Sequence, residues 1–258
     1  MKLTITLIQT NLHWENKEKN MAMFSEKISS IRESTDLIIL PEMFTTGFTM
    51  NASALAEEMN GPTIRWMKEI AIKKNCVITG SLIIKEGDKY FNRLIWMRPD
   101  GFEQYDKRHL FSYADEDKTY SKGENKIIVT LKGWRILPLI CYDLRFPVWS
   151  RNTKNSNYDL MIYVANWPER RAYAWKQLLI ARAIENQSYV AGLNRTGNDG
   201  NDIFHTGESA LIDFKGENIL KENPNENFIL TQVLSKESLE NFRKQFAFSR
   251  DADEFNIF

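Results

Sequence analysis

The sequence lacks net charge, a long apolar run and a set of cysteines. Its 34 lysines and arginines balance 34 aspartates and glutamates, so no long-range field attracts a polyanion, and we expect no nucleic-acid partner. No stretch approaches the roughly 20 apolar residues that a membrane-spanning helix needs. Two cysteines are too few for a disulfide framework, and they stand in no metal-ligand spacing. We therefore expect a protein that uses no membrane and no metal.

The opening segment, MKLTITLIQTN, places Leu3, Ile5 and Leu7 on one side in alternation, and a polar stretch follows at once. This alternation predicts a first β-strand and not a signal peptide. We accordingly expect a cytoplasmic protein.

Predicted helices and strands interleave along the chain. Segment 15–34 has apolar residues three and four apart, as an amphipathic helix does, and segment 36–40 is a short apolar run typical of a buried strand. Further helices are predicted over 61–75 and 172–187, and Asp100-Gly101 is a hairpin turn signal. These alternating elements indicate an α/β protein with a mixed sheet covered by helices.

The stretch LPLICYDLRFPVW, residues 137–149, runs from an apolar strand into a cysteine and then a charged turn. Cys141 thus stands at the carboxyl end of a strand, where open α/β sheets bind ligands. A buried cysteine is also commonly a small core residue, so position alone leaves both interpretations open. No such turn follows Cys76, which we predict to be a core residue.

A nucleophilic cysteine needs a group that removes its proton. The usual group is histidine, and the chain contains His13, His109 and His205. The alternative is a carboxylate beside a cation that supports the developing oxyanion. Glu42, in LPEMF, follows a buried strand, and Lys107, in YDKRHLF, ends a predicted hairpin strand. Because a glutamate flanked by apolar residues is a poor surface residue, we expect Glu42 to be paired.

Three segments, PEMF, DKRHLF and LICYDLRFP, together resemble the glutamate, lysine and cysteine motifs of the nitrilase or carbon-nitrogen hydrolase superfamily, whose members cleave nonpeptide C–N bonds. The resemblance extends over nearly the whole chain, to FRKQFAFSRDADEF. CYDLRFP, ANWPERR and LLIARAIENQSYVAGLNRTGNDG are similar to the ω-amidase branch, and Tyr142 and Asp143 stand where true nitrilases typically show tryptophan and glutamate. The resemblance implies an αββα sandwich of two mixed β-sheets covered by helices.

The resemblance also implies roles for individual residues. Glu42 corresponds to the general base and acid, Cys141 to the nucleophile that forms a thioester, and Lys107 to the oxyanion stabiliser, assisted by the backbone N–H of Tyr142. A second glutamate seen in many members corresponds best to Glu116. This chemistry requires no metal and no organic cofactor.

ω-Amidases act on short dicarboxylic acid monoamides such as 2-oxoglutaramate, 2-oxosuccinamate or succinamate, so the distal carboxylate needs a cation. The candidate cations, all in segments predicted to follow strands, are Arg145, Arg170, Arg171 and Arg195. The candidate pocket walls are Phe44, Tyr142, Trp149 and Trp167. His205 stands where relatives usually have an aromatic hydroxyl, and it either bonds within its loop or contacts the substrate.

No linker rich in Gly, Pro or Ser divides the chain, so we expect one domain over residues 1–258. A homodimer is implied by the resemblance and by apolar surface expected on a helix after RFPVW and on the Phe-rich tail, 247–258, although both segments could equally fold onto their own subunit. Three other functions stay open: an amidase for a different acyl group, an inert dimeric binding or scaffold protein, and a cysteine-histidine hydrolase that uses His109 or His205.

Overall fold

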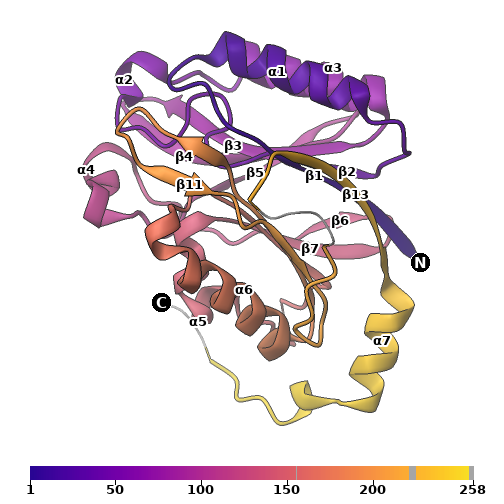
Figure 1. The fold of residues 1–258 in the computed structure, drawn as a ribbon. Coiled ribbons are helices and arrows are strands. Elements are labelled where there is room, and N and C mark those ends of the chain that lie inside the picture. The colour runs from indigo at the N-terminus through magenta and orange to yellow at the C-terminus, as the bar shows by residue number, and fades with distance from the viewer. Residues whose placement is uncertain (155, 221–224, 256–258) are drawn as a thin grey trace.

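Two β-sheets lie face to face at the centre of the molecule, and helices cover their outer faces (Figure 1). The structure is a computed structural model, and it describes residues 1–154, 156–220 and 225–255. The first sheet has the order β13-β1-β2-β3-β4-β5. Its strands are β1 (Lys2–Gln9), β2 (Leu37–Ile39), β3 (Val77–Glu86), β4 (Lys89–Met97), β5 (Phe102–Asp106) and β13 (Phe228–Ser235).

The second sheet has the order β12-β9-β8-β7-β6, and a separate ribbon pairs β10 with β11. The strands are β6 (Val129–Leu131), β7 (Trp134–Ile140), β8 (Leu160–Val164), β9 (Tyr189–Leu193), β10 (Thr196–Asn198), β11 (Phe204–Thr206) and β12 (Ala210–Ile212). The α-helices are α1 (Lys17–Ser30), α2 (Ala52–Leu55), α3 (Pro62–Lys74), α4 (Glu116–Thr119), α5 (Pro147–Ser150), α6 (Ala172–Asn186) and α7 (Lys236–Gln245).

Strand β2 of the first sheet is buried on both faces, which explains why it is a continuous apolar run. Successive side chains of a strand point to opposite faces. Leu37 and Ile39 accordingly join the core between the sheets, whereas Ile38 and Leu40 join the core under α1 and α3. Figure 1 shows these two helices side by side over the outer face of this sheet.

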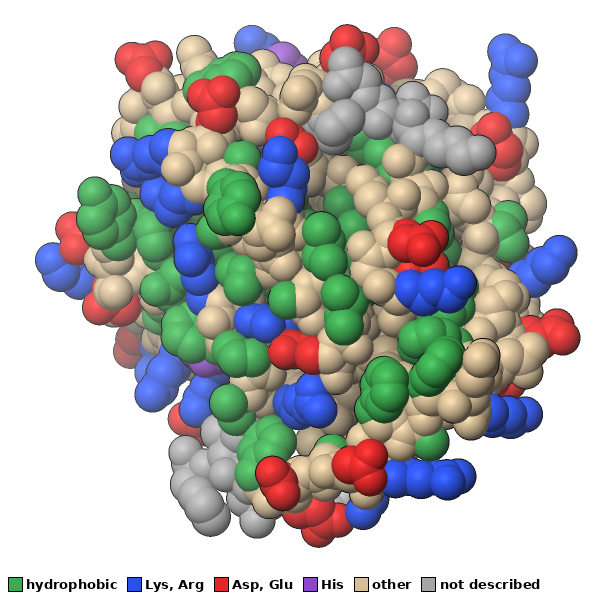
Figure 2. All heavy atoms as spheres, turned by 60° about the horizontal axis from the view of Figure 1, so that its bottom comes forward, with side chains coloured by type: hydrophobic (Ala, Val, Ile, Leu, Met, Phe, Trp, Pro, Cys, Tyr) green, Lys and Arg blue, Asp and Glu red, His purple; other side chains and the backbone are tan. Residues whose placement is uncertain are grey.

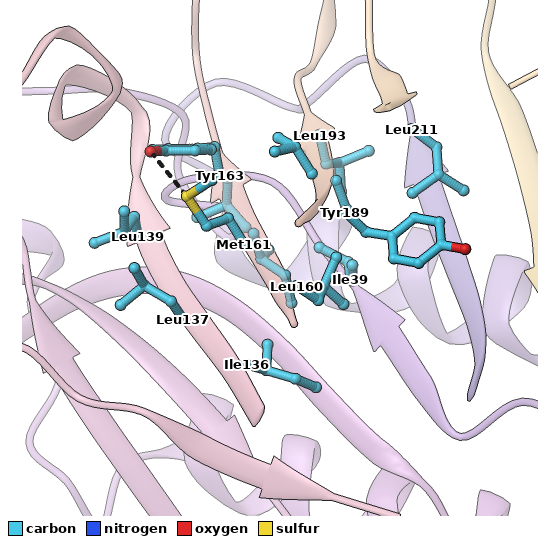
Figure 3. Packing of buried hydrophobic residues seen from close by; sticks show 14 of the residues in the cluster. Ile39, Ile136, Leu137, Leu139, Leu160, Met161, Tyr163, Tyr189, Leu193 and Leu211 are labelled. Atoms are coloured by element: carbon cyan, nitrogen blue, oxygen red, sulfur yellow. Dashed lines mark hydrogen bonds between the residues drawn. The ribbon is translucent and has the colours of Figure 1, made fainter. Parts of the chain in front are cut away.

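The core between the two sheets is built mainly from apolar strands of the second sheet. Figure 3 shows Ile39 of the first sheet close to residues of β7, β8, β9 and β12. Helix α6 covers the other face of the second sheet, where its Trp175 and Leu179 belong to the same cluster. The layers are thus helix, sheet, sheet, helix, and the αββα sandwich with two mixed sheets is confirmed.

Strand direction brings the candidate residues together. β1, β2 and β3 are parallel, and β4 is antiparallel to both β3 and β5, so β5 runs in the direction of β2. β7, β8 and β9 are likewise parallel. The carboxyl ends of β2 and β5 therefore share one edge of the first sheet, and those of β7 and β8 share one edge of the second.

All predicted helices and strands except one helix are present, with ends shifted by a few residues. The helix expected after RFPVW is wrong: α5 is a single turn over Pro147–Ser150, and no further helix begins in the described residues before Glu169. Proline at the first helical position starts this turn, but beyond it the Asn152 side chain donates to the Tyr158 carbonyl and the Thr153 and Ser156 hydroxyls bond each other. Within the described residues, no helix combines the length and apolarity that crossing a membrane requires.

Candidate active site

Three ionisable side chains meet in the buried space between the sheets. Lys107 Nζ lies 2.8 Å from Glu42 Oε1 and 2.9 Å from both carboxylate oxygens of Glu116. All three side chains are almost completely buried. Two carboxylates around one ammonium leave a net negative charge, so the cluster can accept a proton without losing its ion pairing.

Cys141 lies against this cluster, close enough for the charges of Glu42 and Lys107 to act on its thiol. The cysteine is the first residue of a 3-10 helix, η2 (Cys141–Arg145), and its φ of +41° falls in the left-handed region. A side chain other than glycine adopts such a conformation only where the surroundings enforce it, and strain of this kind clusters at functional sites. The turn directs the sulfur out of the strand line toward Glu42.

Burial sets the protonation of this site at rest. It raises the pKa of the Cys141 thiol well above its ordinary value, and the nearby charge of Glu42 raises it further, with Lys107 opposing both. Burial acts to lower the pKa of Lys107, but the charges of Glu116 and Glu42 outweigh it and raise that pKa. For Glu116, burial raises the pKa, and Lys107 opposes the shift. The resting state is therefore a neutral thiol beside a charged lysine, so the thiol proton must leave as the sulfur attacks.

Glu42 is hydrogen-bonded by two asparagines that were not among the predicted site residues. Asn92, on β4, donates from Nδ2 to Glu42 Oε1 at 2.8 Å and to Glu116 Oε1 at 3.2 Å. Asn166, just after β8, donates from its backbone N–H to Glu42 Oε2 at 2.9 Å and from Nδ2 to the Glu42 carbonyl. Asn166 lies in ANWPERR, and its place after a strand was the available signal.

A cavity of about 550 Å³ opens above the cluster. Glu42, Lys107 and Cys141 lie in its wall, together with aromatic side chains from five separate segments. Those aromatic residues are Trp14, Phe48, Phe111, Tyr113, Tyr142 and Trp167. The Phe48 ring also lies 5.2 Å from Lys107 Nζ, which places a cation-π contact beside the ammonium group. The cavity is large enough for a small amide and brings it to the thiol.

Three of the four candidate arginines also line this cavity: Arg145, Arg170 and Arg171. The Arg145 guanidinium lies 5.0 Å from the Trp167 ring, and that of Arg171 lies 4.9 Å from the Phe111 ring. Within the described residues, none of the three forms a salt bridge with a carboxylate. Burial lowers the pKa of Arg171, and the like charges of Arg170 and Arg145 add to the shift. This part of the cavity wall therefore carries three guanidinium groups that have no salt bridge within the described residues.

Three predicted substrate contacts are wrong. Phe44 faces away from the cavity, because the loop reverses at Met43 and carries the ring onto Phe24 and Trp66. Arg195 is buried beside the cavity, where its guanidinium donates to Asn11 Oδ1 and to the backbone carbonyls of residues 196 and 198. Trp149 packs in the core instead, and its indole N–H donates to the Tyr105 hydroxyl.

The histidines occupy different places. His205 lines the cavity, and burial, together with the charge of Arg195, lowers its pKa to about 4, so its imidazole is neutral. His109 is not part of the cavity wall, and its Nδ1 lies 2.8 Å from Asp143 Oδ1. Both histidines have other partners, since His205 Nδ1 lies 3.3 Å from the Gly197 carbonyl oxygen, which argues against a cysteine-histidine pair. Cys76 is buried in the core under α3, as predicted.

No group of three or more His, Cys, Asp and Glu side chains that could hold a metal ion occurs in the described part of the chain. The side chains described at this site supply a thiol, a carboxylate near it, a lysine ammonium and three arginines. This set suits acyl transfer from an amide to sulfur.

The αββα fold and the Glu42, Lys107 and Cys141 cluster point to one class of protein, the cysteine-dependent hydrolases of carbon-nitrogen bonds. The family model described as carbon-nitrogen hydrolase matches residues 4–244, and the chain belongs to this family.

Individual relatives narrow the comparison. The chain is 45% identical to the protein named Omega-amidase YafV of Escherichia coli K12 over 258 residues, which cover 99% of this chain and 98% of that protein. It is 32% identical to the 2-oxoglutaramate amidase of Bacillus subtilis, over 93% of this chain and 94% of that one. A solved CN-hydrolase superfamily structure from Xanthomonas campestris, with an arsenic adduct in its active site, superposes with a TM-score of 0.97 at 41% identity over 100% of both chains.

Proposed function

We propose that this chain is an ω-amidase, which hydrolyses the terminal amide of a short dicarboxylic acid monoamide to the dicarboxylate and ammonia. The observation that carries the proposal is the cavity that joins the Cys141 thiol to three arginines without carboxylate partners in the described chain. A dicarboxylic acid monoamide could place its amide group at the thiol and its distal carboxylate at the arginines. The relatives named as ω-amidase and 2-oxoglutaramate amidase support the same class.

Acylation begins when the Cys141 sulfur attacks the amide carbonyl carbon and the Glu42 carboxylate takes the thiol proton. The oxyanion that forms is stabilised by Lys107 and the backbone N–H of Tyr142. Glu42 then returns the proton to the amide nitrogen, because ammonia leaves only as a neutral group. The C–N bond breaks, a thioester remains, and the proton balance is restored.

Deacylation reuses the same carboxylate. Glu42 takes a proton from a water molecule, whose oxygen attacks the thioester carbon, and the same two donors stabilise the second oxyanion. The C–S bond breaks, and the sulfur regains its proton from Glu42. Because Glu116 bonds Lys107 and does not line the cavity, its proposed task is to position the ammonium group.

Comparing substrates tests this function. Succinamate or 2-oxoglutaramate should be hydrolysed with a higher kcat/KM than an uncharged amide of equal length, as measured by ammonia release. If the uncharged amide or a nitrile matched it, the ω-amidase assignment would fail, and an amidase for another acyl group would be the better description. No ammonia from any amide would favour the inert scaffold instead.

Removing one arginine should weaken binding of the carboxylate only. We expect Arg171→Met to lower kcat/KM for succinamate by roughly 10- to 150-fold, since a charged hydrogen bond contributes about 1.5–3 kcal/mol. The variant should barely change kcat/KM for the uncharged amide. Arg98→Met, which breaks an ion pair with Glu103 on the β4–β5 hairpin, is the matched control. An equal loss on both substrates would show that Arg171 supports the cavity rather than the carboxylate.

The homodimer, the cytoplasmic location and the single domain over 1–258 stay predictions. Hydrophobic and charged side chains intermix on the lower face of the molecule (Figure 2). The exposed apolar side chains of the chain include Val148 of α5, Ile184 of α6 and Phe248 of the tail. The described part of the tail also folds back on its own subunit, where it shares a cleft with residues 148–154.

A further inference from the structure

The Asp143 carboxylate connects the lysine segment to the cysteine segment. Its Oδ2 accepts from the Tyr105 hydroxyl at 2.7 Å and from the Ile140 backbone N–H at 3.0 Å. Its Oδ1 accepts from the backbone N–H of His109 at 3.1 Å and lies 2.8 Å from His109 Nδ1. Both oxygens of this fully buried carboxylate are therefore occupied by donors.

These donors flank the residues to which the proposed function assigns chemistry. Tyr105 and His109 stand two residues before and two residues after Lys107, and Ile140 immediately precedes Cys141. Tyr142, whose backbone N–H is the second oxyanion donor in the mechanism, lies between Cys141 and Asp143 in the chain. One carboxylate thus ties both oxyanion donors and the left-handed Cys141 turn into one hydrogen-bonded unit.

Aromatic packing fixes the His109 side of this unit. The His109 ring stacks on Phe146 with a centroid separation of 3.8 Å and an interplanar angle of 9°. Trp149 meets the same ring edge-on at 6.0 Å, and its indole N–H donates to the Tyr105 hydroxyl at 3.0 Å. Since an ionised carboxylate only accepts hydrogen bonds, His109 Nδ1 carries the proton that faces Asp143.

We propose that the His109–Asp143 pair is a positioning device for the nucleophile turn: it holds Cys141 and the Tyr142 N–H at the correct distance from Lys107. Neither residue lies in the cavity wall, so neither touches the substrate. The inference rests on the proposed roles of Cys141 and Lys107. It assigns to His109 a function in the rate of acylation and none in substrate affinity.

Two substitutions of His109 separate the hydrogen bond from the stacking. His109→Phe keeps a ring against Phe146 but cannot donate to Asp143, whereas His109→Asn places a donor near the Nδ1 position without the ring. We expect His109→Phe to lower kcat by about 10- to 100-fold, the effect of misplacing reacting groups by a fraction of an ångström to 1 Å. KM should change little, alkylation of Cys141 by iodoacetamide should slow, and His109→Asn should recover most of kcat.

A merely structural role predicts a different pattern. Leu239→Ala, a cavity-forming change in the buried side of α7, is the control for lost stability and should leave kcat per folded molecule unchanged. The proposal is overturned if His109→Phe keeps wild-type kcat, or if His109→Asn is no better than His109→Phe. Should His109→Phe not fold, Tyr105→Phe removes one donor with minimal change and should still lower kcat without raising KM; an unchanged kcat there also overturns the proposal.

Measuring Cys141→Ala alongside the His109 and Tyr105 variants distinguishes failure of the proposed function from failure of the positioning role. If Cys141→Ala remains active, the proposed function itself is wrong. If Cys141→Ala is inactive while the His109 and Tyr105 variants behave as wild type, only the positioning role is wrong.

Discussion

Replacing Cys141 by alanine should abolish amide hydrolysis. The loss should be on the order of 10⁶-fold in kcat, the size seen when a hydrolase loses its nucleophile. The physical reason is that the Cys141 thiol lies near Glu42 in the wall of a cavity that Lys107 also lines. Mass spectrometry of enzyme quenched during turnover with succinamate should find the acyl group on a peptide that contains Cys141.

Cys76 provides the internal control for this experiment. It is buried in the core under α3, and burial raises the pKa of its thiol to about 11, so it forms little thiolate near neutral pH. Cys76→Ala should leave kcat near the wild-type value, and no acyl group should be found on it. Full activity in Cys141→Ala, or an adduct on Cys76, would contradict the thioester mechanism.

The position of the active site could be predicted from the places where strands end. Glu42, Lys107 and Cys141 each come directly after an apolar or hairpin strand, and in parallel arrangements such ends meet at one edge. The resemblance of three ordered motifs then linked them. The same resemblance assigns a role to Glu116, and the structure buries it while its neighbours Asp115 and Asp117 are exposed.

Side-chain direction in loops could not be predicted in the same way. Phe44 stands two residues after Glu42, yet the positive φ of Met43 and a backbone bond from Phe44 to Ser81 turn its ring into the opposite core. Arg195 follows β9, but carbonyls of the β10 ribbon draw its guanidinium away from the cavity. Such choices depend on contacts between distant segments, which a single sequence does not display.

The role of a polar residue that points inward from the middle of a strand could not be predicted from the sequence either. Asn92 lies inside β4, between Phe91 and Arg93, where periodicity alone marks an ordinary strand. Its value appears only when β5 places Lys107 beside it, through a backbone bond from Lys107 N–H to the Asn92 carbonyl. The same amide then reaches both carboxylates. A buried polar side chain of this kind signals a site only once its partners are known.

Glu42→Gln should abolish both formation and breakdown of the thioester, because an amide side chain cannot relay a proton. General acid-base catalysis contributes about 10²- to 10⁴-fold in a single step, and both steps use this carboxylate, so we expect a loss in kcat at or above the upper value. Single-turnover mass spectrometry should show no acyl group accumulating on Cys141, whereas a variant blocked only in deacylation would accumulate one.

Glu116→Gln is the matched comparison. Either substitution is isosteric, removes one negative charge and leaves one carboxylate paired with Lys107, so both variants start from the same buried charge balance. The difference lies in position: Glu42 lines the cavity with Cys141, whereas Glu116 bonds Lys107 and the Phe111 backbone N–H. We therefore expect Glu116→Gln to keep measurable acylation and to lose less kcat than Glu42→Gln, with similar melting temperatures. Equal losses in the two variants would mean that proton transfer cannot be assigned to Glu42 alone, and Glu116 would then have to share it.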